Sequence, residues 1–285
     1  MARTLIVGID TVAGSSLAQQ LAKRSEVSGL WFSGPKSHQG CQTGRVNSES
    51  LRKEAAAADV VVFCGGAAQS SWDPGFGDFT SERQWLSECI DAVHSAGRRL
   101  VLISSDAVFC GPWVFHDDDS SAVASDRFAK TILKYESLVA GVADSLIVRT
   151  NITGTTAGSF VAETVDAIRD VRLVKVDAAT FATPIAPENF AAALAGCLDG
   201  GTTGYVNIAG AERSTPFHFA MALANHLDLP SEQIQSVAGN KKTVERSMRC
   251  NRLRDERDQH APLMRSMLEC LAEALDDQRQ LSVAA

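Results

Sequence analysis

The sequence predicts an α/β protein with a doubly wound parallel sheet and a small α/β lobe towards its C-terminal end. Short apolar runs, of the kind that parallel sheets bury on both faces, recur through the first 150 residues. Segments with the apolar spacing of helices separate these runs, so that strand and helix alternate along the chain. Such alternation is typical of parallel sheets covered by helices on both sides.

The first unit joins a strand at residues 4–8 to a helix at residues 15–23 through a glycine turn. Further strands are expected at residues 29–33, 59–64, 99–104 and 145–149, and further helices at residues 81–96, 128–136 and 159–169. We therefore expect a Rossmann-type dinucleotide-binding domain over residues 1–150. A substrate lobe is expected over residues 151–285, with some segments returning to the main domain.

The composition is that of an ordinary globular protein, with 45% hydrophobic and 21% charged residues in a chain of 285. The net charge of −7 argues against binding to nucleic acid or to an anionic membrane. Seven scattered cysteines without a CxxC pair indicate reduced thiols rather than disulfides or a zinc site. No apolar run reaches the length of a membrane span, so we expect a cytoplasmic protein that binds no membrane. No metal is expected either.

The turn after the first strand reads Gly-Ile-Asp-Thr-Val-Ala-Gly, from Gly8 to Gly14. Strand, glycine turn and helix form the context in which a pyrophosphate binds to the N–H groups of a helix N-terminus. Gly8, Asp10, Thr11 and Gly14 are therefore candidate cofactor-binding residues. Thr11 adds a Cβ and Asp10 a negative charge, so the alternative is a turn that keeps its glycines for geometry alone.

The end of the second expected strand bears on the choice of cofactor. Ser33, Gly34, Pro35 and Lys36 follow it, and none of them is a carboxylate that could bind a ribose 2′-hydroxyl. The lack of an acid and the presence of Lys36 favour NADP(H) over NAD(H). The alternative for Lys36 is a solvated loop charge.

The segment from Arg99 to Glu136 carries the expected chemistry. A strand runs into Ser-Ser-Asp-Ala-Val-Phe, from Ser104 to Phe109, and an acidic loop then leads to a helix containing Phe128. This segment resembles the catalytic region of the extended short-chain dehydrogenase/reductases, in particular the dTDP-4-dehydrorhamnose reductase-like, sugar-nucleotide-binding group. In that group the strand ends in a Ser-Thr-Asp-Tyr-Val-Phe-like run, and the helix carries Tyr-x-x-x-Lys.

The resemblance implies a role for each position of this frame. Ser105 stands at the catalytic Ser/Thr, which bonds the substrate carbonyl in the family, and Asp106 continues the match into the substrate site. Phe128 and Ile132 stand at the proton-donating tyrosine and its lysine. Because neither side chain can donate a proton, conventional reductase catalysis is not expected. For Ser105 the alternative is a turn hydroxyl that bonds local backbone.

Two neighbouring features support this alignment of the helix. Tyr135 lies about 10 Å further along a helix than Phe128, with no lysine at i+4 after it. Glu136 falls where the family has a Gly-Glu pair. The loop before the helix contains His116 and three aspartates at 117–119, for which capping of the helix is favoured over metal binding.

Further segments extend the resemblance over roughly residues 3–275. Gly65, Gly66 and Ala67 follow a buried strand where the family has an Asn-Ala-Ala-type run beside the cofactor, so the resemblance makes them cofactor-binding candidates. Residues 182–191 match a Thr-Pro segment that opens a helix in the family. Residues 204–210, Gly-Tyr-Val-Asn-Ile-Ala-Gly, match its Gly-x-Tyr-His-Leu-Ala-Gly strand.

The resemblance also implies where a nucleotide sugar would lie. Thr150 and Asn151 end a strand that resembles the family's Leu-Arg-Thr strand over the substrate site. Arg246 and Arg249 lie in a basic segment, residues 241–257, where the family has an Arg-Pro-x-x-Ser-like stretch that reaches the diphosphate. Guanidinium groups pair well with phosphate oxygens. The alternative is a charged helix face.

Two functions are compatible with this pattern. The first is a reductase-like protein that binds NAD(P) and/or a nucleotide sugar or other small molecule, lacks conventional catalysis and has a binding or regulatory role. A protein partner and a homodimer are further expectations for it. The alternative is an NADP-dependent reductase of a dTDP-4-keto-sugar, or a related epimerase, that uses an unconventional acid.

Overall fold

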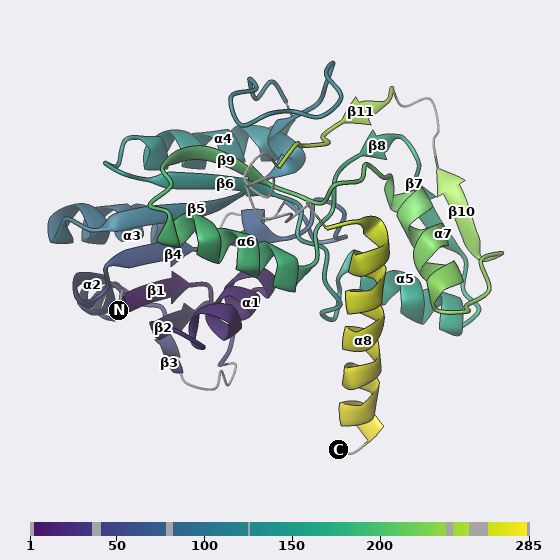
Figure 1. Ribbon diagram of the computed structural model, residues 1–285, viewed down its shortest axis with the longest axis horizontal. Helices are drawn as coiled ribbons and strands as arrows, with labels where there is room; N and C mark the ends of the chain where they lie inside the picture. The colour runs from purple at the N-terminus through teal and green to yellow at the C-terminus, as the bar shows by residue number, and fades with distance from the viewer. Residues whose placement is uncertain are drawn as a thin grey trace.

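The computed structural model describes residues 3–35, 41–77, 82–124, 126–237, 242–250 and 262–283. A main domain surrounds one large sheet, and a smaller lobe, which includes the last helix, lies beside it (Figure 1). Within the described residues, no helix combines the length and the apolar character that a membrane crossing needs.

Seven strands form one parallel sheet in the order β3-β2-β1-β4-β5-β6-β9. Their bounds are Arg3–Val7 (β1), Glu26–Trp31 (β2), Cys41–Arg45 (β3), Val60–Phe63 (β4), Arg99–Ser105 (β5), Leu146–Thr150 (β6) and Gly204–Ile208 (β9). This arrangement confirms the doubly wound sheet expected from the sequence. The strand order reverses at β1, which lies between β2 and β4, and open sheets bind ligands at such a switch point.

Helices cover both faces of the sheet (Figure 1). One layer consists of α1 (Val12–Leu21) and α6 (Pro187–Asp199), and the other of α2 (Ser48–Ala57), α3 (Glu82–Ala96) and α4 (Arg127–Ala140). Leu5 packs into the α2–α4 layer and its neighbour Ile6 into the α1–α6 layer, both fully buried. A strand buried on both faces needs apolar residues at consecutive positions, which explains the uninterrupted apolar runs.

The second lobe has its own hydrophobic core. Its helices are α5 (Phe160–Arg169), α7 (Pro216–His226) and α8 (Met264–Val283), and its strand pairs are β7 (Val174–Asp177) with β10 (Ile234–Val237) and β8 (Thr180–Phe181) with β11 (Val244–Glu245). Trp72, from the loop after β4, packs in this core with ring centroids 5.7 Å from Phe160 and 5.5 Å from Phe219. This loop therefore ties the main domain to the lobe.

A buried ion pair fixes α4 to the sheet. Arg149 on β6 donates from Nη2 to Oε2 of Glu136 at 2.8 Å and from Nε to Oε1 at 3.0 Å. The Ser104 hydroxyl on β5 donates to Oε1 of the same carboxylate at 2.6 Å. Because Arg149 and Glu136 are both at least nine-tenths buried, these bonds hold the helix in one position along the sheet.

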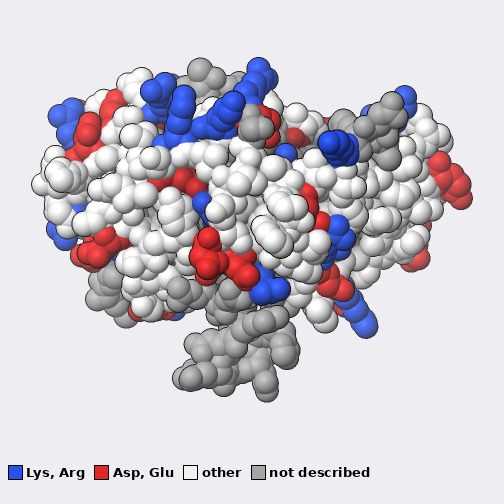
Figure 2. Space-filling model, turned by 90° about the horizontal axis from the view of Figure 1, so that it is seen from above, with Lys and Arg blue, Asp and Glu red and all other residues white. Residues whose placement is uncertain are grey.

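The surface seen from above carries charges of both signs, and several Lys and Arg side chains gather along one edge of it (Figure 2).

Candidate functional site

The predicted cofactor and catalytic residues meet at the carboxyl edge of the sheet. The β1–α1 turn, the end of β4 and the end of β5 lie there side by side, because β1, β4 and β5 are parallel neighbours. Parallel sheets bring the carboxyl ends of their strands to one edge, where ligands bind.

Packing alone requires the two glycines of the β1–α1 turn. Gly8 has a φ of +87°, and a Cβ there would come within 2.1 Å of the Cys64 carbonyl oxygen. A Cβ on Gly14 would come within 2.1 Å of the Gly8 carbonyl oxygen. Both contacts are impossible for a real Cβ, so each position must be glycine whether or not a ligand binds.

Thr11 caps α1 with its own side chain. Its hydroxyl accepts from the Gly14 N–H at 3.1 Å and donates to the Gly8 carbonyl at 2.8 Å. Within the described residues, the N–H groups of Val12 and Ala13 have no hydrogen-bond partner, as expected in the first turn of a helix. Two donors of the helix N-terminus are therefore available to a pyrophosphate, and this part of the turn fits a dinucleotide.

Asp10 reaches from the turn to the end of β2. Its Oδ1 accepts from the Phe32 N–H at 3.0 Å and its Oδ2 from the Ser33 N–H at 2.8 Å. The end of β2 therefore carries a carboxylate after all, supplied by another element. Lys36, expected to favour NADP(H), lies outside the described residues.

The end of β4 is occupied by a side chain that the sequence did not single out. Gly66 opens a short 3₁₀ turn over Gly66–Ala68, and its N–H donates to the carboxylate of Glu82 at the start of α3. A Cβ on Gly65 would collide with the same carboxylate. Gly65 thus leaves room for Glu82 and Gly66 binds it, while Ala67 packs in the core at 5% exposure.

A buried polar network lies at the ends of β5 and β6. The Ser105 hydroxyl accepts from the Ala107 N–H at 3.2 Å and donates to Asp106 Oδ1, also at 3.2 Å. Asn151 donates to Asp106 Oδ2 at 3.0 Å and accepts from the Ser70 hydroxyl at 2.6 Å. The hydrogen bond from the Ala107 N–H to Ser105 is of the local kind expected if the Ser105 hydroxyl stabilises the turn.

Burial raises the pKa of Asp106, against the opposing effects of Arg246 and of hydrogen bonds from Ser71, Asn151 and Ser105. Asp106 has no exposed surface, but Ser71 reaches the cavity described below. The Ser71 hydroxyl therefore connects the buried carboxyl group to that cavity. Thr150 is also buried, and its hydroxyl has no hydrogen-bond partner in the described structure.

Phe128 and Ile132 lie one turn apart on the face of α4 that packs against the sheet. The Phe128 ring lies against the α-carbon of Gly77, where an added Cβ would meet it at 2.3 Å. Ile132 is completely buried in the core between the sheet and the α2–α4 layer. The two positions that the resemblance aligns with the tyrosine and the lysine are thus occupied by apolar side chains that pack against the core.

A cavity of about 600 Å³ lies at the junction between the loop after β4 and the second lobe. It is lined by Ser71, Trp72 and Pro74 from the loop and by residues of α5 and β7. Arg246 also lines it, and its Nε atom and the Trp72 Nε1 atom are buried without a hydrogen-bond partner among the described residues. Both atoms are covered by the surrounding side chains and not open to the cavity.

The structure separates the two arginines that the sequence grouped together. Arg246 is 18% exposed in the cavity wall, with a long 4.0 Å contact to Asp126. Arg249 is 43% exposed and pairs with Asp117 at 3.3 Å, away from the cavity lining. Asp118 in turn accepts from the Asn207 N–H at 2.7 Å. This acidic loop therefore holds neighbouring segments in place, and no metal-binding cluster occurs in the described parts of the chain.

Asp73 links the same loop to the second lobe. Its Oδ1 accepts from the Phe160 N–H at the start of α5, at 2.8 Å. Burial raises the pKa of Asp73 to about 6, although this hydrogen bond and one from the Ser70 backbone oppose the shift. Glu82, Ser71 and Asp73 could not be found from the sequence, because the residues that they contact are distant along the chain.

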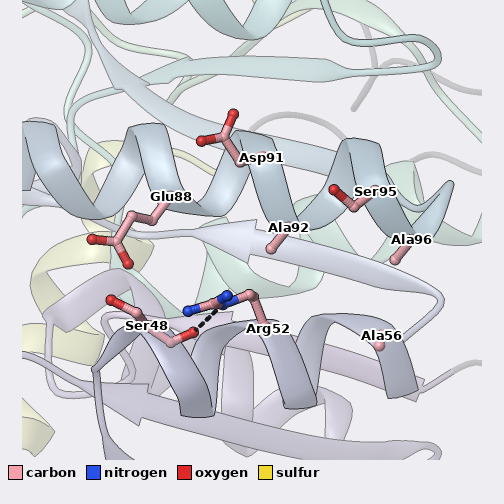
Figure 3. Close-up of a pocket in the computed structure, with 8 residues that line it drawn as sticks. All are labelled: Ser48, Arg52, Ala56, Glu88, Asp91, Ala92, Ser95 and Ala96. Carbon is pink, nitrogen blue, oxygen red and sulfur yellow. Dashed lines mark hydrogen bonds between the residues drawn. The ribbon is translucent and has the colours of Figure 1, made fainter.

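A second hollow, of about 520 Å³, lies between α2 and α3 (Figure 3). Alanines leave it open, and Arg52 on α2 donates to the Ser48 carbonyl at 3.0 Å along its floor. It contains none of the predicted site residues.

The sheet order, the covering helices and the second lobe define the fold of the nucleotide-sugar-processing reductases, epimerases and dehydratases. A family model described as the RmlD substrate binding domain matches residues 2–273. The chain belongs to this family, which confirms the resemblance found in the sequence. A search of curated protein sequences found no match.

Solved structures agree with this assignment of the fold. A hypothetical dTDP-4-dehydrorhamnose reductase from Sulfolobus tokodaii is 21% identical, with a TM-score of 0.76 over 93% of this chain and 99% of that one. A dTDP-4-dehydrorhamnose reductase from Bacillus anthracis, in complex with NADP, is 15% identical, with a TM-score of 0.75 over 95% and 98%. A dTDP-glucose 4,6-dehydratase from the same organism, in complex with NAD, is 13% identical, with a TM-score of 0.81 over 98% of both chains.

Proposed function

We propose that this protein binds a nucleotide sugar and a nicotinamide dinucleotide in a binding or regulatory role, without the proton relay of its family. The observation that carries the proposal is the packing of α4. Phe128 has no exchangeable proton and lies against Gly77, and Ile132 has no charge and no exposed surface. Loss of a general acid alone removes about 10²–10⁴-fold in rate.

The cavity beside the second lobe supports the binding half of the proposal. Its volume of about 600 Å³ is in the range of small-molecule sites. Arg246 lines it and carries a guanidinium group, which suits the oxygens of a diphosphate. Apolar walls at Phe160 and Pro216 suit the remainder of a nucleotide sugar.

The dinucleotide would bind at the β1–α1 turn, where its pyrophosphate would accept from the Val12 and Ala13 N–H groups. A bound nicotinamide supplies hydride transfer in this fold class. Cofactor binding without turnover would make the protein a sensor of its two ligands, or a subunit that acts on a partner.

The binding half is tested by a matched pair of arginine variants. We expect Arg246→Met to weaken binding of dTDP and of dTDP-sugars by about ten- to a hundredfold, because a charged hydrogen bond to phosphate is lost. Arg249→Met removes the same charge outside the cavity and should leave the affinity within about twofold. Calorimetric titration measures both, and equal effects of the two variants would refute the placement of the ligand.

The catalytic half is tested on the unmodified protein. Purified chain is incubated with NADH or NADPH and 4-keto-sugar nucleotides, and nicotinamide absorbance is followed. Turnover at ordinary enzyme rates would overturn the proposal and favour the second candidate function.

The second candidate is a reductase or epimerase that uses an unconventional acid. One specific observation favours it: burial raises the pKa of Asp106, and the Ser71 hydroxyl joins Asp106 to the cavity. A carboxyl group kept protonated by burial can serve as a proton donor. In this case Asp106→Asn would abolish turnover while leaving the affinity for dTDP-sugars unchanged.

A further inference from the structure

The carboxylate of Asp10 occupies the end of β2 although its own residue belongs to the β1–α1 turn. Each of its oxygens accepts one backbone N–H, from Phe32 and from Ser33. Two hydrogen bonds fix both the position and the orientation of the group. Asp10 is only partly exposed, so that water screens its charge incompletely.

This place in the fold decides between the two nicotinamide dinucleotides. In doubly wound sheets, the residue at the end of the second strand contacts the adenosine ribose. A carboxylate there accepts from the ribose 2′-hydroxyl of NAD, whereas a cation there accommodates the 2′-phosphate of NADP. In this chain Ser33 stands at the strand end, and Asp10 supplies the carboxylate from the adjacent turn.

We infer that Asp10 makes the dinucleotide site selective for NAD(H) against NADP(H). A 2′-phosphate would meet a fixed negative charge, and the Phe32 and Ser33 N–H groups that could have bound it are already occupied. This inference rests on the proposed dinucleotide binding and specifies which dinucleotide binds. It reverses the preference for NADP(H) that the sequence suggested.

A described cation near this edge is engaged elsewhere. Arg45, at the end of β3, lies over the Trp31 ring, 5.9 Å from its centroid. It stands one strand further from the β1–α1 turn than the end of β2 does. Release of Arg45 from Trp31 would be needed before it could pair with a 2′-phosphate.

The test is a comparison of dissociation constants for NADH and NADPH, measured by nicotinamide fluorescence and by calorimetry in the absence of substrate. The unmodified chain should bind NADH at least about tenfold more tightly than NADPH. Asp10→Asn and Asp10→Ser should each shift the ratio of the two constants towards NADPH by about tenfold or more. Asp199→Asn, which removes one exposed charge at the far end of α6, should leave the ratio unchanged.

The outcomes separate this inference from the proposed function. Equal affinity of the unmodified chain for both dinucleotides would overturn the selectivity and leave dinucleotide binding intact. An unchanged ratio in folded Asp10 variants would overturn the role of Asp10, as would tight NADPH binding that Arg45→Met abolishes. Failure to bind either dinucleotide would overturn both the inference and the dinucleotide part of the proposed function, while the Arg246 titrations still report on the sugar site.

Discussion

Placing a tyrosine and a lysine on α4 is the most direct test of the proposal that this protein lacks the proton relay of its family. The double variant Phe128→Tyr with Ile132→Lys places a tyrosine and a lysine at i and i+4, on the same face of the helix. The Phe128 ring already lies at the carboxyl edge against Gly77 and needs only a hydroxyl. Ile132 is the harder change, because it has no exposed surface.

The structure sets the expected magnitudes. Replacing a fully buried isoleucine by lysine loses apolar packing and desolvates a charge, and we expect it to lower the free energy of unfolding by about 2–5 kcal/mol. The destabilisation should lie at the lower end of this range if the lysine stem stays in the core and its amine reaches the crevice. A restored proton donor contributes about 10²–10⁴-fold in rate. The double variant should therefore be less stable and gain reductase activity.

The assay follows NADH and NADPH oxidation with a dTDP-4-keto-sugar, alongside thermal unfolding and ligand titration. Phe128→Tyr alone should give a smaller gain, and Ile132→Leu serves as a control for core disturbance. A double variant that is folded and binds both ligands, yet is as inactive as the unmodified chain, would refute the assignment of these positions.

Two further predictions concern the turn and the inter-lobe loop. Thr11→Gly should lower the free energy of unfolding by a few tenths to about 1 kcal/mol, because the hydrogen bond that caps the Gly14 N–H is lost. The same variant should bind NADH more tightly, because the Cβ beside the expected pyrophosphate is removed. Unchanged NADH affinity in fluorescence titration would show that Thr11 does not obstruct the site. The pKa of Asp73 is about 6 in the folded state, against an ordinary value of 3.8, so the native state holds a proton that the unfolded state releases. The free energy of unfolding should therefore fall as the pH rises from about 4 to 7, by at most about 3 kcal/mol. Asp73→Asn should flatten that dependence in denaturant unfolding at pH 4.5 and 8, and a profile parallel to that of the unmodified chain would contradict the assignment.

The sheet could be predicted because its signals are local. A strand buried between two helix layers must be apolar at consecutive positions, as Leu5 and Ile6 are, and the sequence displays this directly. The confirmed family resemblance rested on the same strand ends and on the order of the motifs.

The site could be predicted only in part, because side-chain reach is not local. Asp10 and the missing acid after β2 were both visible in the sequence, but the contact that joins Asp10 to Phe32 spans 22 positions. In the sequence, the missing acid and Lys36 favoured NADP(H). The inferred selectivity for NAD(H) rests instead on the contact of Asp10 with the end of β2. Glu82 was missed for a further reason. An acidic residue in the first turn of a helix is already explained by its favourable interaction with the helix dipole, so it did not indicate a contact with Gly66.

The anchoring of α4 bears on why Phe128 and Ile132 lie where they do. Glu136 is held by Arg149 and Ser104 in a fully satisfied, buried arrangement, one turn beyond Ile132 along the same helix. Breaking such a pair by removing one partner costs about 3–5 kcal/mol, so the helix cannot slide or rotate freely along the sheet. Phe128 and Ile132 therefore stand where this anchor places them, and the proposed absence of the proton relay would be one of side-chain chemistry rather than of helix position. It follows that restoring activity should require substitutions at these two positions and no change in the backbone.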